Sequence, residues 1–597
     1  MIASGRSAAL LGAAFLASWP AVAATDPRFF PLAEVVPGLR GEARTVLLGH
    51  RVETVPLEVI GVSPDFAGPG RDVILARLLG DRTRLTGVVS GMSGSPVILD
   101  GRLAGALAYR IGTFTQEAIA AITPIQQMLA IPSGTEDGDP MWQARGERYP
   151  VESLVGSAPW PASAAVHTDP GSISTPVAVS GLLPGVREHF AEIFQGSRLG
   201  PFFTAAERTE SRAEEPLHGG DAIAAVLVRG DLTMAATGTV TLVSGRQVLA
   251  FGHPLSRAGR IDFPMARASV LATVPSLAGS FKVVRIGSTI GAFRQDRSAG
   301  VAGRLEAVSR LLPVSVEVRP GGGAKSSSYQ FELVRAPGLT PNLVEVVLAN
   351  TLLSADPGGQ RGTIRMTGKI RVDENRSIPV ETLFSGGERS APPALQAARF
   401  GAALLAALYR SPLSGDRDLA LDLTCSFQEE INILQVAEVR LDRASGRPGE
   451  VITVSTSLRD HASGKLRHAV LSIPLPDLAP GSQLQLLVGD APSAMAADGT
   501  VQAVGALGTA RGLDHVVESL SRILPSSALY ARLLRAAPGV MIGTEPMPAL
   551  PPSVAAVLAA DSSSSSRKEL SRSVIAAAAK TEDGVVVGSR RFLVTLK

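Results

Sequence analysis

The sequence predicts a mainly β protein with several domains. Its 597 residues are too many for one hydrophobic core and indicate roughly three to five domains. Hydrophobic residues make up 45% of the chain and charged residues 19%, which is typical of a packed globular protein. The 61 glycines and 42 prolines favour frequent turns and short strands over long helices.

The first β unit is expected between residues 44 and 110, where short apolar segments are separated mostly by Gly, Pro or Asp. Asp100-Gly101 is a hairpin signal between the last two of these segments. Residues 119–131 are expected to close the unit as a helix.

A second β-rich stretch runs from residue 222 to 318, and residues 328–385 continue the β-type alternation. A buried packing helix is expected at 394–410. From about residue 435 the apolar segments are spaced like the strands of a sandwich, and residues 515–534 have helical periodicity.

The N-terminus has the pattern of a secretory signal. Arg6 precedes a short apolar run at residues 8–18, and Ala21-Val22-Ala23 has small residues where a signal peptidase would cleave. The apolar run is too short to span a bilayer, and no other segment is a membrane-span candidate. We therefore expect an exported protein, periplasmic or secreted, without a stable membrane span.

Composition also excludes several kinds of site. The net charge is only +3 and no long Lys/Arg run occurs, so nucleic acid is not an expected partner. Cys425 is the single cysteine, which rules out an intrachain disulfide and a cysteine-cluster metal site. The eight histidines show no metal-binding spacing. We expect neither a metal nor a cofactor.

The motif that best indicates chemistry is Gly91-Met92-Ser93-Gly94-Ser95-Pro96. A nucleophilic serine must lie on a tight turn with backbone N–H groups directed at the developing oxyanion. Gly91 and Gly94 permit such a turn. The N–H groups of Gly91 and Ser93 are the candidate oxyanion hole. The same residues could instead form a β-turn without chemistry.

A catalytic serine also needs a base. His253, in Phe251-Gly252-His253-Pro254, follows an apolar strand and is the best candidate, and His50 is its rival. The carboxylate that would orient the base could be Asp81, Asp262 or Asp296, between which spacing does not decide.

At this point the sequence resembles the SpoIVB peptidase family. Residues 86–106 resemble its nucleophile region, residues 237–254 its histidine region, and residues 291–303 the segment that follows. The resemblance covers roughly residues 40–130 and 218–312. It implies a chymotrypsin-like double β-barrel, with Ser93 as nucleophile and His253 as base. Asp81 approximately matches the family's aspartate.

Two departures from the family's pattern stand out. In the sporulation enzymes the histidine precedes the serine, whereas here Ser93 comes first, so the barrels would be permuted. Geometry rather than chain order defines a triad. In addition, no PDZ-like segment separates the motifs, so the substrate choice of those enzymes is not transferred.

The full prediction is a double-barrel peptidase core followed by a β-sandwich-like region with a few helices. The protein is expected to be an exported serine endopeptidase that acts on a protein or peptide. The alternative is a catalytically inactive envelope scaffold or binding protein, with a partner on the C-terminal region. A nucleotide-binding loop is disfavoured because GMSGS lacks the P-loop lysine.

The expected parts are a signal peptide (1–23), a serine-bearing subdomain (24–135), a linker (136–175), a histidine-bearing subdomain (176–320), a β/helical extension (321–434) and the C-terminal region (435–597).

Overall fold

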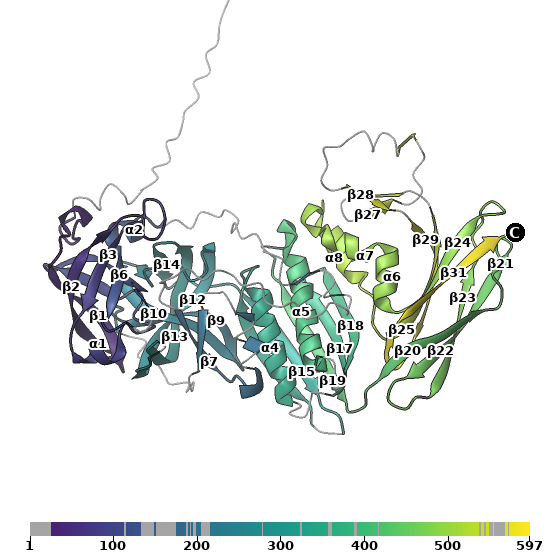
Figure 1. Ribbon diagram of the computed structural model, residues 1–597, viewed down its shortest axis with the longest axis horizontal. Helices are drawn as coiled ribbons and strands as arrows, with labels where there is room; N and C mark the ends of the chain where they lie inside the picture. The colour runs from purple at the N-terminus through teal and green to yellow at the C-terminus, as the bar shows by residue number, and fades with distance from the viewer. Residues whose placement is uncertain are drawn as a thin grey trace, which may run out of the picture.

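The protein is mainly β, as the sequence predicts. A computed structural model shows its modules following one another along the longest axis, from the N-terminal barrel to the C-terminal sandwich (Figure 1). The signal segment and most of the expected linker lie outside the described residues. The structure describes residues 26–112, 115–132, 149–150, 154, 175–186, 189–190, 193–194, 199–203, 215–277, 279–322, 325–355, 361–386, 391–415, 417–536, 539–542, 545–547, 553–554, 567–570 and 572–597.

The N-terminal module is a closed six-stranded barrel in the order β1-β2-β3-β6-β5-β4. All neighbouring strands are antiparallel, and their inner faces form one apolar core. A short helix α1 (Asp81–Thr86) precedes the serine motif. The strands are β1 (Arg40–Leu48), β2 (Arg51–Ser63), β3 (Val73–Leu78), β4 (Pro96–Leu99), β5 (Arg102–Arg110) and β6 (Ile119–Pro124).

The expected helix at residues 119–131 is wrong in its first half. Residues 119–124 form β6, which pairs with β3 and β5 and is almost fully buried. Only α2 (Ile125–Leu129) is helical. The alanines that suggest a helix are small residues in a strand that is buried on both faces, where periodicity does not separate strand from helix.

The second module contains another closed ring of six strands. Pairing runs β9-β12-β13-β14-β11-β10, and β10 returns to β9. The double-barrel architecture is thus confirmed. Phe251, Phe263 and Phe293 fill the interior of this ring. The strands are β9 (Ala222–Gly230), β10 (Thr233–Ser244), β11 (Gln247–Ala250), β12 (Gly259–Val274), β13 (Phe281–Arg297) and β14 (Gly300–Leu305).

The sheet extends beyond the ring on both sides. One extension holds β7 (Thr175–Ser180) and β8 (Leu199–Phe203). The other holds five strands, and two packed helices lie beside them (Figure 1). Those elements are β15 (Leu311–Arg319), β16 (Ser327–Val334), α4 (Thr340–Ala355), β17 (Gly362–Arg371), β18 (Ser377–Gly386), α5 (Pro393–Tyr409) and β19 (Ala420–Gln428).

Helix α5 confirms the predicted packing helix, but α4 corrects the expectation of unbroken β structure over residues 328–385. Residues 343–352 of α4 are all buried, so the segment lacks the polar face by which an amphipathic helix is recognised.

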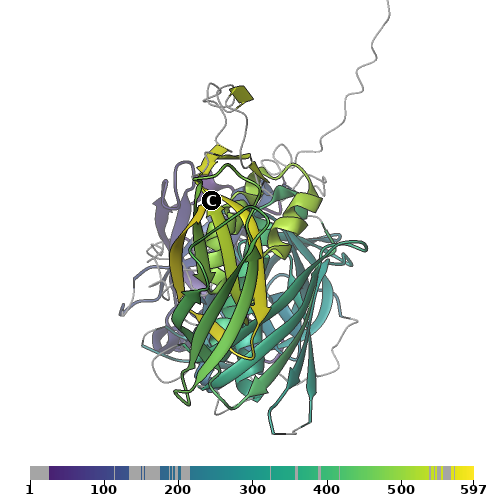
Figure 2. The same cartoon turned by 90° about the vertical axis from the view of Figure 1, so that its right-hand side faces the viewer.

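The C-terminal module has two sheets around one apolar core, as the sandwich-like spacing predicts, and Figure 2 views the molecule from this end. The expected helix at 515–534 covers only α8 (Leu513–Ser521), because residues 528–535 pair as a strand. The strands of the two sheets are β20 (Ile433–Leu441), β21 (Ser445–Gly446), β22 (Val451–Asp460), β23 (Leu466–Pro474), β24 (Gln483–Gly489), β25 (Ala528–Arg535), β29 (Ser573–Thr581), β30 (Val585–Val587) and β31 (Ser589–Leu596).

Three further elements complete this end of the chain. Helices α6 (Ala491–Asp498) and α7 (Thr500–Gly505) precede α8, and a small separate sheet contains β26 (Gly539–Ile542), β27 (Glu545–Met547) and β28 (Arg567–Leu570). Within the described residues, no helix is both long and apolar enough to cross a membrane.

Candidate active site

The serine motif forms the turn between α1 and β4. Gly91 and Gly94 have φ values of +98° and +93°, a conformation that glycine adopts without strain. The Met92 N–H donates to the Val89 carbonyl, and the Ser95 N–H donates to the Met92 carbonyl. The motif therefore forms the tight glycine turn that the sequence predicts.

This turn packs directly on the second barrel. The Thr239 N–H of β10 donates to the Ser93 carbonyl at 2.8 Å, and the Thr239 hydroxyl donates to the Gly91 carbonyl at 3.0 Å. A β-carbon placed on Gly94 would lie 2.4 Å from the backbone nitrogen of Phe251. Phe251 is two residues before His253, so the fold brings together the serine and histidine segments that are far apart in the sequence.

Ser93 and Ser95 have different surroundings within the turn. The Ser95 hydroxyl donates to the Met92 carbonyl at 2.6 Å. The Ser93 side chain is also fully buried, yet its Oγ makes no hydrogen bond to any residue that the structure describes. The N–H groups of Gly91 and Ser93 likewise donate no backbone hydrogen bond within the described part of the chain. These groups thus form no such hydrogen bond, but all of them are buried in this conformation.

His253 is presented by another turn, which is strained at Phe251. Phe251 has φ +68°, an uncommon conformation for a residue with a bulky side chain, and Gly252 has φ +67°. The Gly252 carbonyl accepts a hydrogen bond from the Thr123 hydroxyl of the first barrel at 2.7 Å. Backbone strain of this kind is often found at functional sites. The histidine turn is thus fixed by contacts with both barrels.

The hydrogen bond of His253 defines its tautomer. Its Nδ1 is 2.9 Å from the Pro254 carbonyl oxygen, which can only accept, so the hydrogen bond requires a proton on Nδ1 and the neutral imidazole would have its lone pair on Nε2. The imidazole is fully buried. Because the Ser93 Oγ has no hydrogen bond to a described residue, the two side chains are not hydrogen-bonded in this conformation.

Asp81 does not reach the histidine. It is the first residue of α1, its side chain is fully exposed to solvent, and its carboxylate is 3.9 Å from Arg84. A fully exposed carboxylate does not contact a fully buried imidazole. The structure therefore does not form the predicted Ser93–His253–Asp81 triad, because the residues around Asp81 form a surface helix.

The other two aspartates have structural partners. Asp262 pairs with Arg294 and accepts the Arg310 N–H. Asp296 is buried and accepts hydrogen bonds from the N–H groups of Leu255, Ser256 and Ala258. Burial raises the pKa of Asp296, and these hydrogen bonds oppose that shift. Asp296 therefore holds the loop that follows His253.

The rival base His50 is exposed in the turn between β1 and β2. Its neighbour Gly49 exchanges backbone hydrogen bonds with Val270 of β12. This exposed position contrasts with the buried serine turn, so the structure favours His253 over His50 as the base.

Lys282 of β13 is a buried basic residue that sequence reasoning missed. Its Nζ donates to the Thr45 hydroxyl at 2.8 Å, and its Cδ would lie 3.2 Å from a β-carbon on Gly91. Burial lowers its pKa to about 7. The available signal was a single lysine within an apolar strand, flanked by Phe281 and Val283.

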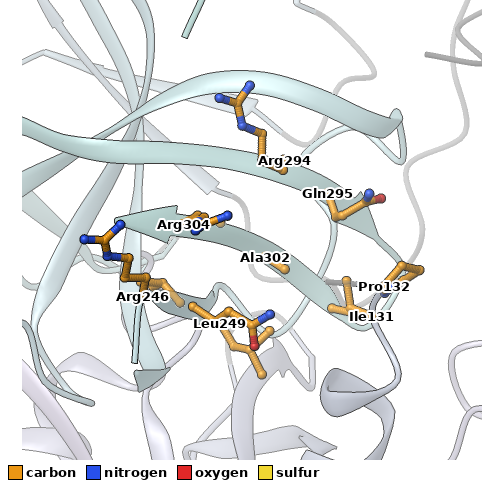
Figure 3. A pocket seen from close by; sticks show the side chains of 11 residues that line it. Ile131, Pro132, Arg246, Leu249, Arg294, Gln295, Ala302 and Arg304 are labelled. Carbon is orange, nitrogen blue, oxygen red and sulfur yellow. The ribbon is translucent and has the colours of Figure 1, made fainter. Parts of the chain in front are cut away.

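The described residues contain no cluster of three His, Cys, Asp or Glu side chains placed to hold a metal ion. A cavity of about 310 Å³ is lined by strands β11, β13 and β14 together with Ile131 and Pro132 (Figure 3). Ser93, His253 and Lys282 do not line it. Two of its three arginines pair with carboxylates, Arg246 with Glu306 and Arg294 with Asp262.

Comparisons with protein families, with curated proteins and with solved structures gave no match.

Proposed function

We propose that the protein is an exported serine endopeptidase of the SpoIVB type with Ser93 as its nucleophile. Ser93 Oγ attacks the carbonyl carbon of a peptide bond, and His253 Nε2 accepts the hydroxyl proton. The N–H groups of Gly91 and Ser93 bind the oxygen that becomes negatively charged. The sequence resemblance and the contact between the two motif segments support this proposal.

The observation that carries the proposal is the buried Ser93 hydroxyl without a hydrogen bond to a described residue. A buried polar group in this state costs about 1–3 kcal/mol of stability. Native proteins keep few such groups, and catalysis is one reason to keep them. The hydroxyl of Ser95, two residues away, donates a hydrogen bond to the Met92 carbonyl.

Substrate access requires a local opening, because Ser93 and His253 are both fully buried. Ser90, just before the turn, accepts the Lys282 N–H and donates to the Ser280 carbonyl. Residues 280–282 thus lie against the turn from the side of the second barrel.

The test is proteolysis of an unfolded protein substrate by the purified mature chain. We expect cleavage by the wild type and a loss of at least about 10³-fold in Ser93→Ala, because the nucleophile is absent. Ser95→Ala is the matched control and should keep the activity, since its hydroxyl is already bound to a carbonyl. Equal cleavage by the wild type and Ser93→Ala would contradict the proposal.

The second candidate is a non-catalytic envelope scaffold that binds a partner. The complete burial of Ser93 and the solvent-exposed position of Asp81 favour this alternative. The C-terminal module also exposes large apolar side chains, among them Leu466, Val470 and Leu593. Two results together would support the scaffold. The wild-type protein would cleave no substrate, and Ser93→Ala would fully restore the function of cells that lack the protein.

A further inference from the structure

Lys282 is buried between the two barrels without a carboxylate partner in the described part of the chain. It is 2% exposed, and its backbone N–H donates to the Ser90 carbonyl at 3.1 Å. Its Nζ donates to the hydroxyl of Thr45, which is fully buried in β1. Lysines are almost never buried unless they are paired, so an unpaired buried lysine indicates a function.

The charged groups around Lys282 either bond to other residues or lie on another face of the strand or at the surface. Glu42 and Arg44 of β1 pair with each other at the surface. Arg267 of β12 donates to the Glu215 carbonyl. Arg285 is three residues further along β13, on the opposite face of the strand. Asp81 of α1 is exposed. Burial alone therefore accounts for the low pKa of Lys282.

The lysine side chain runs along the serine turn. Its Cγ and Cδ would lie 3.4 and 3.2 Å from a β-carbon on Gly91, whose N–H belongs to the proposed oxyanion hole. Nζ is two bonds beyond Cδ. Ala43 of β1 pairs with Val97 of β4, and continuing this register places Thr45 level with Ser95. The stem of Lys282 thus lies beside Gly91 of the serine turn, and its amine bonds to Thr45 of β1, the strand that pairs with β4.

We propose that Lys282 is a further catalytic residue, whose ammonium group stabilises the negative charge on the carbonyl oxygen when Ser93 attacks. This inference rests on the proposed peptidase function. An ammonium has three N–H donors, and Thr45 accepts one of them. A buried cation without a counter-ion is complementary to an anion that exists only in the transition state.

The reaction balances without a change in Lys282. Ser93 Oγ bonds to the carbonyl carbon, its proton moves to His253, and the carbonyl electron pair moves to the oxygen that faces Lys282. Collapse of this intermediate breaks the C–N bond, and the leaving amine takes the proton from His253. Water then hydrolyses the ester, with its proton returning through His253 to Ser93. Lys282 keeps its proton throughout.

The experiment measures the second-order rate at which a fluorophosphonate probe modifies Ser93 between pH 5.5 and 9.5. The probe's phosphoryl oxygen takes the place of the oxyanion. Because only the ammonium form acts, the wild-type rate should fall as the pH rises above about 7. This limb reports the free protein.

Lys282→Met should react about 10²-fold more slowly at pH 6.5, the usual effect of removing one oxyanion donor, and should lack the alkaline limb. Lys369→Met is the matched control, because Lys369 is exposed on β17. It should behave like the wild type. Lys282→Arg keeps the charge at all of these pH values and should lack the limb.

The outcomes separate the two proposals. No modification of wild-type Ser93 at any pH would overturn both. Modification of the wild type without an alkaline limb would overturn the role of Lys282 alone. This result is obtained with the wild-type protein, so it does not depend on whether a variant folds. A Lys282→Met protein that reacts slowly but keeps the limb would also overturn it, since a merely structural lysine gives that result.

Discussion

At the scale of single residues, the hydrogen bonds of the serine turn distinguish Ser93 from Ser95, and the family resemblance also selects Ser93. Ser93 and Ser95 share one turn, and both are fully buried. Only the Ser95 hydroxyl has a hydrogen bond within the described residues. Gly94, with its positive φ, turns the chain between the two serines.

The buried Lys282 should make the stability of the protein depend on pH. Its pKa falls from 10.5 in the unfolded chain to about 7 in the folded protein. Between these values the unfolded chain binds more protons, so the free energy of unfolding rises with pH. The expected slope from this group is up to about 1.4 kcal/mol per pH unit.

Urea unfolding of the wild type and Lys282→Met at pH 7.5, 8.5 and 9.5 measures this contribution. We expect the variant to be the more stable protein at pH 7.5 and to lose that advantage as the pH rises. Comparing the two proteins cancels the titration of groups that they share. Parallel pH profiles would contradict a lysine held in a site that disfavours its charge.

Residue-level sequence reasoning found the serine and the histidine but not their surroundings. Short motifs mark Ser93 and His253, because glycines must lie at fixed positions next to them. Asp81 was placed by approximate similarity, and it proves to be the exposed start of a helix. Asp296 and Lys282 are buried by contacts with segments distant in the chain, and the neighbouring sequence does not predict such contacts.

At the scale of elements, the glycine turn fits against β10 with no spare room. A β-carbon on Gly94 would lie 2.0 Å from the Thr239 carbonyl oxygen and 2.4 Å from the Phe251 nitrogen. Both are backbone atoms and cannot rotate away. Gly94→Ala should therefore separate the serine turn from the histidine segment.

We expect Gly94→Ala to lose about 1–3 kcal/mol from the strained φ and about 1–3 kcal/mol more from overpacking. Gly101→Ala is the control, because Gly101 has φ +72° and nothing lies within 4 Å of its added β-carbon. Urea unfolding measures both variants. Equal losses in the two would show that the packing of Gly94 against β10 is not tight.

The sequence predicts strands better than it separates strand from helix in fully buried segments. The sandwich strands alternate between buried and exposed residues, as in β22, and were predicted correctly. Strand β6 and helix α4 are buried on nearly every side, so neither has the polar positions that reveal its period.

At the scale of the whole molecule, the contact between the two barrels brings the serine and histidine segments together, although their order in the chain is reversed. The first barrel carries Ser93 and the second carries His253, and the turns of both residues lie where the barrels meet. Each ring closes through pairings between distant segments, such as β11 with β14 and β1 with β4. Composition and periodicity predict the strands of the barrels, but not which strands close the rings.

The central claim is that Ser93 is a nucleophile, and locating a covalent adduct tests it most directly. The mature wild-type protein is treated with a fluorophosphonate probe, digested and analysed by tandem mass spectrometry. We predict one modified residue, Ser93, with no adduct in Ser93→Ala and normal modification in Ser95→Ala. An adduct on another serine, or none on the folded wild-type protein, would contradict the account.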